Sequence, residues 1–493
     1  MTARYIITGM AIVLFATTMV SCNKFTDLTP ISEATNENAY TTAKEAEAAL
    51  TGAYDALQQE YYVWDNVIFS DVLSDNYYAG GDNPEIFAVD KLQIVPTNAR
   101  LFTNWGQIYG GIARANTVLE KVPAIADPQL DENGRRNEIL GEAYFLRAFH
   151  YFNLVKLFGG VPLILVPVEA SKTEEYIIPK STEVQVYDQI IADLEQAESL
   201  LPDSFSEESG INKSRATKGA ANALLAKVHA QRPDRDYNRV LSYCDAVINS
   251  PANYRLLENF SELFDGAHYN NAESIMEVQY VGAPEGNFGP QMLLPPSLSG
   301  DTWRKFVTPS HDLVNAFDSE ADVIRKNSSI LFEKVSWLDE FWGNQSGSEV
   351  PFAYKWKNAS GWASSNRQYI IRLGDIILLK AEALNELGRI AEARESLNQI
   401  RQRAKISPSQ AANQTDLRAA ILKERRLELC QEAQRWDDLK RVGTTVAVMN
   451  ELNEVDLRTN QRVDYNMTAD KLVLPIPQQE LDRNAQLTQN PGY

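Results

Sequence analysis

Cysteine and histidine are scarce in this chain of 493 residues, which contains three cysteines and four histidines. The sequence has no CxxC pair and no cysteine and histidine cluster with the spacing of a zinc site. The motifs HExxH, GxSxG and GxxxxGK(S/T) are also absent, which removes three common signatures of catalysis and nucleotide binding. The sequence therefore predicts no catalytic residues, no metal ligands and no cofactor, and we expect a protein that is not an enzyme.

The sequence is also poor in positive charge. It has 47 lysines and arginines against 66 aspartates and glutamates, which gives a formal net charge of -19 at pH 7. Because an acidic surface without a basic patch repels phosphate backbones, nucleic acid is excluded as a partner. The same charge disfavours polyanionic ligands.

Long apolar runs are missing from the chain beyond its first residues. The early run Tyr5 to Val20 follows the positive Arg4 and is shorter than a bilayer span of roughly 20 residues, as expected for the core of a signal peptide. Met19-Val20-Ser21-Cys22 resembles a lipobox. We expect a signal peptide over residues 1–21 and a lipid attached to Cys22, so that the protein is anchored and not spanning. The alternative is a soluble secreted protein in which Cys22 is incidental.

Two further cysteines, Cys244 and Cys430, lie far apart within helical patterns. An export compartment permits a disulfide between them. Cysteine is equally common as a small buried hydrophobic residue. The sequence leaves both readings open.

Helical periodicity covers most of the chain, and strand pattern is scarce. Ser274 to Val281 alternates, with Glu277 and Gln279 on the polar face, and the extended pieces Leu163–Val166 and Leu472–Ile476 are short. The fold class is therefore mainly α, with a few short strands and long loops. The predicted helices are 43–60, 100–121, 136–158, 183–201, 216–231, 236–250, 370–387, 390–405 and 415–442.

Several predicted helices form pairs with tight connections. The clearest pair surrounds Gly388, where Ala381, Leu384, Leu387 and Ala393 occupy the small and apolar positions of a tetratricopeptide repeat. Such hairpins stack through their apolar faces and leave loops on one side, so we expect one scaffold of tetratricopeptide-like hairpins with a loop-rich region. An unrelated helical array is the alternative. The other pairs are 220–248, 136–158 with 183–201, and 43–60 with 100–121.

The most informative stretch runs from Glu142 to Ile164. Its polar residues Arg147, His150, Asn153 and Lys156 form one narrow stripe at a spacing of three, and nearly all the other residues are apolar or aromatic. A helix that is apolar over most of its circumference packs on several sides. Gly159-Gly160 ends it, because glycine takes the left-handed conformation favoured at a helix C-terminus. We expect an inner helix of a layered helical protein.

This stretch resembles the hallmark of the SusD/RagB family of nutrient-binding outer-membrane lipoproteins. The resemblance extends from the lipobox to the last residue. It implies a tetratricopeptide-like scaffold, a SusC-like TonB-dependent transporter as partner and attachment to outer-membrane lipid. The other segments that carry it are 216–229, 425–441, 474–480 and 487–493.

The pattern and the resemblance together divide the chain into five parts. We expect a signal peptide, a lipid-anchored tether, an N-terminal SusD-like helical part, a loop-rich inserted region that binds the ligand, and a C-terminal SusD-like part with the last helix pair. The predicted limits are 1–21, 22–42, 43–260, 261–368 and 369–493.

The loops contain the candidate binding residues. Aromatic rings stack on the apolar faces of sugars, and carboxylate and amide groups bond the hydroxyls, so aromatic residues in polar, glycine-containing loops are the best candidates. Residues 74–83 and 285–366 have this character. Each tryptophan has packing as its alternative role, and an Asp or Asn there is also typical of turns. The predicted ligand-binding residues are Asp75, Asn76, Tyr78, Trp337, Trp342 and Trp362.

Other polar residues are interpreted as structural. His150 and His229 lie in packed helices, whereas His268 and His311 lie in loops where binding is an alternative. Asp82-Asn83 is compatible with calcium but offers few ligands. A charged set at helical spacing is interpreted as exposed pairs that contribute a few tenths of a kcal/mol each. Its members are Glu428, Glu432, Arg435, Asp437 and Arg441.

We therefore expect a cell-surface lipoprotein of the outer membrane that binds a nutrient glycan and delivers it to a SusC-like transporter. A RagB-like peptide-binding uptake component is an alternative, as are an assembly scaffold without a small ligand and a lipoprotein hydrolase. The sequence leaves open which glycan is bound and how the anchor is oriented, although the resemblance favours the cell exterior.

Overall fold

The computed structural model describes residues 39–168, 174, 176–206, 208–337, 339, 341–342, 347–456 and 459–493. The predicted signal peptide, Cys22 and most of the tether lie outside the described residues. In the described part of the chain, no helix is both long enough and apolar enough to cross a bilayer.

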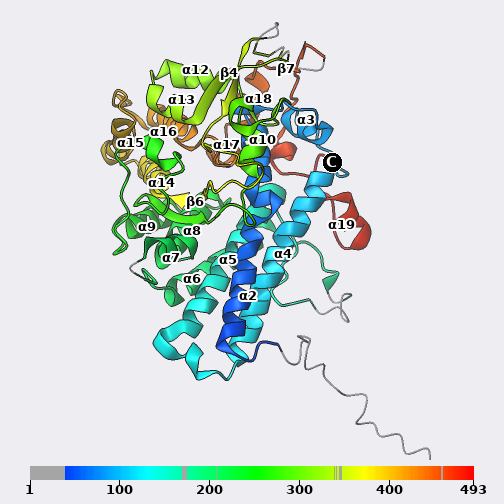
Figure 1. The fold of residues 1–493 in the computed structure, drawn as a ribbon, viewed down its shortest axis with the longest axis vertical. Helices are drawn as coiled ribbons and strands as arrows, with labels where there is room; N and C mark the ends of the chain where they lie inside the picture. Colours follow the sequence, from blue (N-terminus) through cyan, green and yellow to red (C-terminus); the bar gives the residue numbers. More distant parts are fainter. Residues whose placement is uncertain are drawn as a thin grey trace, which may run out of the picture.

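Helix pairs form the scaffold, and successive pairs pack on one another. Within the described residues, α4 packs on α5, α6 on α8, and α9 on α14. The long helices α2, α4 and α5 lie side by side in the lower half of Figure 1. This arrangement confirms the mainly α fold of tetratricopeptide-like hairpins. The pairs are α2 (Ala43–Asp55) with α4 (Ala99–Lys121), α5 (Arg135–Phe158) with α6 (Glu183–Leu200), α8 (Lys218–Gln231) with α9 (Tyr237–Ile248), and α14 (Leu373–Glu386) with α15 (Ile390–Arg403).

Helix α5 is the inner helix that its composition predicts, because it packs against α2, α4 and α6. Arg147, His150 and Asn153 of its polar stripe are buried along with its apolar residues, and Lys156 is half-buried. Arg147 pairs with Asp193 of α6 at 2.7 Å, and the ring of His150 lies against the hydroxyl of Tyr62 at 2.5 Å. Burial lowers the pKa of His150 to about 3, with a smaller contribution from Arg114. The stripe therefore joins α5 to its neighbours, and only Lys156 at its end is partly exposed.

The prediction of one continuous helix over 415–442 is wrong. It is two helices, α16 (Gln414–Leu429) and α17 (Arg435–Val442), separated by a turn in which Gln431 and Ala433 have left-handed φ angles of 65° and 55°. The helix predicted over 43–60 likewise ends at Asp55. Two π-helical turns, Tyr61–Asp65 and Ile68–Val72, follow it.

The strands are short and pair in antiparallel twos. The strand expected at 274–281 is present as β2, but all five of its residues are buried, so the predicted polar face is wrong. Glu277 is buried, and its carboxylate accepts a hydrogen bond from the Asn270 backbone at 2.6 Å. The pairs are β1 (Tyr77–Tyr78) with β3 (Thr308–Pro309), β2 (Ser274–Val278) with β6 (Gln368–Arg372), β4 (Ile330–Lys334) with β5 (Glu349–Ala353), and β7 (Val455–Asp456) with β8 (Gln461–Arg462).

Some of the shorter helices lie over one end of the scaffold, together with loops. Helices α12 and α13 and strand β4 lie together at the top of Figure 1, far from the lower ends of α2 and α5. The shorter helices are α3 (Pro84–Asp90), α7 (Ser209–Ser214), α10 (Gly289–Leu293), α11 (Pro296–Ser299), α12 (His311–Ser319), α13 (Val323–Ser329), α18 (Thr445–Glu451) and α19 (Gln478–Arg483). The domain limits proposed at 260 and 368 stay a prediction.

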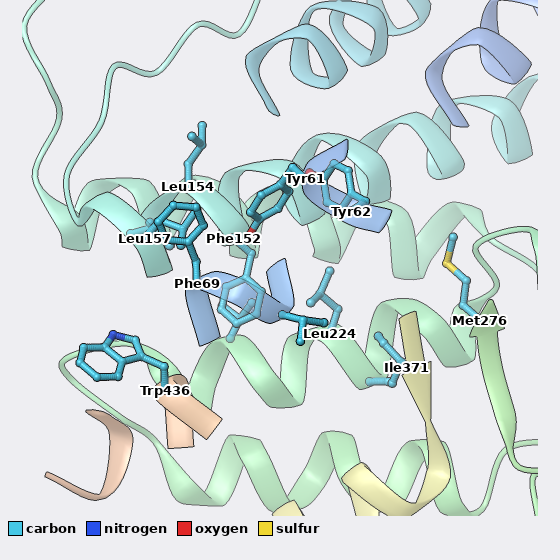
Figure 2. Close-up of a cluster of buried hydrophobic side chains, with 14 of the residues drawn as sticks. Tyr61, Tyr62, Phe69, Phe152, Leu154, Leu157, Leu224, Met276, Ile371 and Trp436 are labelled. Atoms are coloured by element: carbon cyan, nitrogen blue, oxygen red, sulfur yellow. The ribbon is translucent and has the colours of Figure 1, made fainter. Parts of the chain in front are cut away.

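The centre of the core contains a cavity of about 90 Å³ where the π-helical turns meet α5 and α8. Figure 2 shows Tyr61, Phe69, Phe152 and Leu224 gathered in this region. Unpartnered polar atoms of Asn66 and Gln368 belong to its lining residues.

A buried ion-pair network corrects the interpretation of the charged set at 428–441 as exposed. Glu428 has no exposed surface and binds Arg372 at 2.6 Å and Arg325 at 3.1 Å, and it also pairs with Arg403. Glu432 binds the same Arg372 at 2.7 Å. A buried charge is tolerated only when it is paired, so this network fixes α16 against β6, α13 and α15.

The remaining members of that set are also engaged. Arg435 binds Asp75, Arg441 binds Glu382 and Asp438, and Asp437 binds Lys156 at 2.7 Å. Cys244 and Cys430 are free, buried thiols, which settles the open question of a disulfide between them. Burial raises the pKa of both thiols, so neither is a reactive thiolate at neutral pH.

Candidate ligand-binding site

The pairing of β1 with β3 connects the two loop regions in which the sequence places its candidates. Tyr77 lies opposite Pro309, and Tyr78 lies opposite Thr308. Gly80 and Gly81 follow β1 where the chain passes very close to its neighbour. A Cβ atom on Gly80 would lie 2.4 Å from Thr308, and one on Gly81 would lie 2.3 Å from Phe306. Glycine permits this close approach because it has no Cβ atom. Close packing therefore explains the glycines of the first loop.

Aromatic side chains gather over this strand pair. The ring centres of Tyr78 and Phe341 are 4.5 Å apart, and those of Phe341 and His311 are also 4.5 Å apart. His311 lies 3.7 Å from Trp342, and Phe332 meets Trp342 edge to face at 5.6 Å. These five residues come from β1, α12, β4 and the loop before β5. We call Tyr78, His311, Phe332, Phe341 and Trp342 the aromatic loop cluster.

Hydrogen bonds fix the cluster in place. The indole nitrogen of Trp342 donates to the Pro309 carbonyl at 3.1 Å, and the His311 ring bonds the Phe341 carbonyl at 2.6 Å. The carboxylate of Asp339 accepts from the Tyr78 hydroxyl at 2.9 Å. Burial, followed by Asp339, raises the pKa of Tyr78 well above its ordinary value, so Tyr78 stays a neutral donor. Tyr78 is buried, with 3% of its surface exposed, and lies beneath the other four rings, which are half-buried. These contacts hold the half-buried rings rigidly, as a stacking surface requires.

Trp337 and Trp342 share a second small apolar group. Both pack against Val335, Val350 and Phe352, and Trp337 meets Phe352 at 6.4 Å between ring centres. Both tryptophans are half-buried. The structure thus brings together three of the predicted residues, Tyr78, Trp337 and Trp342. Their contact with a ligand stays a prediction.

Trp303 adds an aromatic ring beside this area. It lies 5.4 Å from Phe306, which in turn lies 5.8 Å from Trp64. The ammonium of Lys305 lies 3.6 Å from the Trp303 ring centre. Trp303, His311 and Phe341 were not among the predicted ligand-binding residues. The signal that would have identified them is their position in the loops flanking β3 and β5, which only the strand pairing makes visible.

Asp75 and Asn76 are buried beneath the cluster, away from any open surface. Asp75 binds Arg435 through two bonds of 2.7 Å, and Asn76 accepts from Arg426 at 2.7 Å and donates to Asp71 at 2.8 Å. Burial raises the pKa of the Asp75 carboxyl, but the two arginines outweigh it, and the pKa lies below its ordinary range. The predicted ligand contact of Asp75 and Asn76 therefore has no support in the geometry, which gives them the role of holding this loop on α16 and α17.

Trp362 lies in a separate turn and makes no ring contact among the described residues. Its side chain is 50% exposed, and its φ angle of 75° is left-handed, as are those of Ser360 and Gly361. Non-glycine residues rarely adopt this conformation, and it indicates strain that the surroundings must impose. Asn287 and Ser364 clamp the turn through two backbone bonds of 2.8 and 3.1 Å. The turn therefore presents Trp362 to solvent in a fixed position.

The remaining candidates have structural partners. Asn83 accepts from the backbone of Glu85 and Ile86 and caps α3, so its oxygen is engaged and not open for calcium. His268 bonds Asp265 at 2.6 Å on the surface. Within the described ranges, no three acidic, histidine or cysteine side chains converge as a metal site would require.

Two protein families match the chain. One, described as the SusD family, matches residues 341–493. The other, described as "Starch-binding associating with outer membrane", matches residues 24–229.

Individual relatives match nearly the whole chain. Two SusD-like proteins of Formosa agariphila are 27% and 28% identical, over 96% and 99% of this chain and 96% and 100% of their own lengths. A solved structure of a laminarin-binding SusD-like protein is 29% identical and superimposes with a TM-score of 0.74 over 92% of this chain and 100% of its own.

Proposed function

We propose, because the chain belongs to the SusD family, that it binds a nutrient glycan at the outer membrane and has no catalytic role. The single observation that carries this proposal is the aromatic loop cluster. Four half-buried rings and the buried ring of Tyr78 are supplied by segments far apart in the sequence and are fixed by hydrogen bonds at one end of a helical scaffold. One matching family is described as starch-binding, and the related solved protein is described as laminarin-binding. Starch and laminarin are both neutral glucans, which favours this class of ligand.

The arrangement supports capture without bond cleavage. A ring face of Trp342 gives a sugar an apolar surface, and neighbouring carboxylates such as Asp312 offer acceptors for hydroxyl groups. We propose Trp337, Trp342 and Trp362 as the ligand-contacting tryptophans, with Trp342 at the centre. Because all three rings are held by the fold, little conformational entropy is lost when a glycan binds.

Affinity gel electrophoresis tests this function. We expect laminarin or starch in the gel to retard the protein, and the Trp342→Ala variant to lose about tenfold in affinity, which corresponds to about 1.4 kcal/mol. Tyr243→Ala is the matched control, because Tyr243 is a half-buried aromatic residue on α9 in the scaffold. Loss in both variants, or retardation only by peptide mixtures, would contradict the proposal and favour the RagB-like alternative.

The finer proposal concerns delivery. We propose that Cys22 carries a lipid that anchors the protein to the outer membrane, and that a SusC-like TonB-dependent transporter receives the glycan. Support comes from the lipobox-like sequence before Cys22 and from a matching family that is described as associating with the outer membrane. Fractionation of cells with Cys22→Ala should release the protein from the membrane, and the unchanged protein should co-purify with a TonB-dependent barrel. Recovery of an unlipidated native protein would exclude the anchor.

A further inference from the structure

The positive side chains beneath the aromatic loop cluster are already neutralised by acids of the same chain. The ammonium of Lys305 has no exposed side-chain surface and binds Asp301 at 2.8 Å and the Gln291 carbonyl at 2.8 Å. Arg426 binds Asp312 at 2.6 Å and Asp75 at 3.3 Å. A ligand that needed either cation would have to displace a carboxylate from it.

One positive side chain on the strand side of the cluster is balanced in the same way. Lys326, which lies over the Phe332 ring, binds Asp318 at 2.6 Å. Lys334 is exposed, and its position in the β4–β5 register is opposite Glu349. Arg304 is engaged by the protein as well. Residues 338, 340 and 343–346, which lie outside the described part of this loop, include no lysine or arginine in the sequence.

A fixed carboxylate lies at the centre of the cluster. Asp339 accepts from the Tyr78 hydroxyl and from the backbone of Phe341 and Trp342 at 3.1 and 3.0 Å. Its negative charge lies beside the rings that form the stacking surface. Together with a net charge of -19 for the chain, this carboxylate makes the surface unfavourable for a second anion.

We infer that the site takes uncharged glycan chains and rejects chains that carry carboxylate or sulfate groups. This inference rests on the proposed function, because it specifies the ligand class of the same site. An anionic group that approaches the rings loses part of its hydration and needs a charged donor in return. Lys305, Arg426 and Lys326, which lie beside the rings, already serve acids. A neutral sugar needs only ring faces and hydroxyl partners, which the cluster supplies.

Affinity gel electrophoresis with four glycans tests the inference. Laminarin and starch are neutral, whereas alginate carries a carboxylate on every unit and a sulfated galactan carries sulfate esters. We expect retardation by at least one neutral glycan, with a Kd that changes less than twofold between 50 and 500 mM NaCl, and no retardation by either charged glycan. Salt-sensitive binding of a charged glycan by the unchanged protein would overturn the inference and leave glycan binding intact. Failure of every glycan to bind would overturn the proposed function itself.

A charge variant sharpens the test. Asp312 is exposed at the edge of the cluster and pairs with Arg426 at 2.6 Å, so Asp312→Lys removes this acid from Arg426 and adds a second cation beside it. We expect this variant to gain binding to alginate that weakens at least tenfold above about 300 mM salt, as screening shortens the range of its charge. The matched control is Glu195→Lys on the exposed face of α6, which should gain none. Equal gains in both variants would show that net charge alone decides, and would overturn the role assigned to the cluster.

Discussion

The imidazole of His311 stacks on the indole of Trp342 with 3.7 Å between ring centres and an angle of 33° between their planes. The same imidazole bonds the carbonyl of Phe341, the residue that precedes Trp342. His311 therefore supports both the ring face and the backbone of the proposed stacking residue. We assign it the role of a positioning residue that acts through Trp342.

Two substitutions separate these contributions of His311. His311→Phe keeps a ring against Trp342 and removes the hydrogen bond, whereas His311→Gln keeps a donor and removes the ring. We expect His311→Ala to lower glycan affinity about tenfold, corresponding to about 1.4 kcal/mol, because Trp342 is no longer held. The better of the two conservative variants should restore most of that loss.

The measurement is the glycan Kd by isothermal titration, with the thermal midpoint recorded for each variant. A purely structural role would lower the midpoint in all three variants and leave the Kd of the folded protein unchanged. That result would remove His311 from the binding site.

The buried network around Glu428 predicts a large loss of stability when one of its charges is removed. Glu428→Gln leaves Arg325, Arg372 and Arg403 with fewer acidic partners in a fully buried place. Removing one partner of a buried pair costs about 3–5 kcal/mol. Urea unfolding should show this decrease. The control Glu195→Gln, on an exposed helix face, should change the free energy of unfolding by less than about 0.5 kcal/mol.

The same network predicts sensitivity to acid. Burial raises the pKa of Glu428, but Arg403, Arg372 and Arg325 outweigh it, and the pKa in the folded protein lies below the ordinary 4.5. A carboxyl whose pKa is lowered by folding stabilises the protein above its unfolded pKa, and this contribution is lost as pH falls toward the folded value. The urea midpoint should therefore fall steadily below pH 4.5, and by less in Glu428→Gln. A urea midpoint that does not change below pH 4.5 would contradict the stabilising role of this network.

Because of the buried carboxyl of Glu454, we expect a contribution to stability that depends on pH in the opposite sense. It is buried, it accepts a hydrogen bond from the Tyr465 hydroxyl at 2.7 Å, and its other oxygen has no hydrogen-bond partner. Burial, followed by the charge of Asp90, raises the pKa of Glu454 well above 4.5. Folding therefore favours the protonated form, and this group costs stability as pH rises from 4.5 toward its folded pKa.

The isosteric variant Glu454→Gln resembles the protonated form at every pH. We expect it to match the unchanged protein near pH 4.5 and to exceed it in thermal midpoint at pH 7 to 8. Glu451→Gln, on the exposed side of α18, serves as the control and should show no gain. If Glu454→Gln is less stable at pH 8, Glu454 is ionised and paired in the folded protein, contrary to this prediction.

The helical scaffold was predictable because its signals are local. The hairpin around Gly388 and the apolar inner helix at 142–158 are visible as spacing of small, apolar and polar residues within one or two helices. The break at 430–434 was not, because it contains no glycine or proline. Tertiary bonds impose it: the Lys355 backbone donates to Gln431, and the Ala433 backbone donates to Asp71.

For the candidate site, only the loop regions that contain it were predictable from the sequence. The tryptophans of 337–362 lie in the region that the composition indicates, but pairing of β1 with β3 decides which rings meet. Asp75 looked like a ligand residue because it lies beside tyrosines in a polar loop. Its partner Arg435 lies 360 positions later in the chain, and no local pattern reports a contact at that separation.

We expect that replacing Trp362 with glycine stabilises the fold and weakens glycan binding. Its left-handed φ angle of 75° costs about 1–3 kcal/mol for a residue with a side chain, whereas glycine adopts it freely. Since half of the side chain is exposed and no aromatic ring among the described residues packs on it, its removal sacrifices little packing. We therefore expect Trp362→Gly to leave the free energy of unfolding unchanged or to raise it by about 1 kcal/mol, while glycan affinity falls several-fold.

Trp362→Ala keeps the strain and lacks the ring, so it should lose the same affinity without the gain in stability. Chemical unfolding and glycan titration of both variants decide the matter, because a turn that serves only the fold would lose stability in both and bind glycan as before.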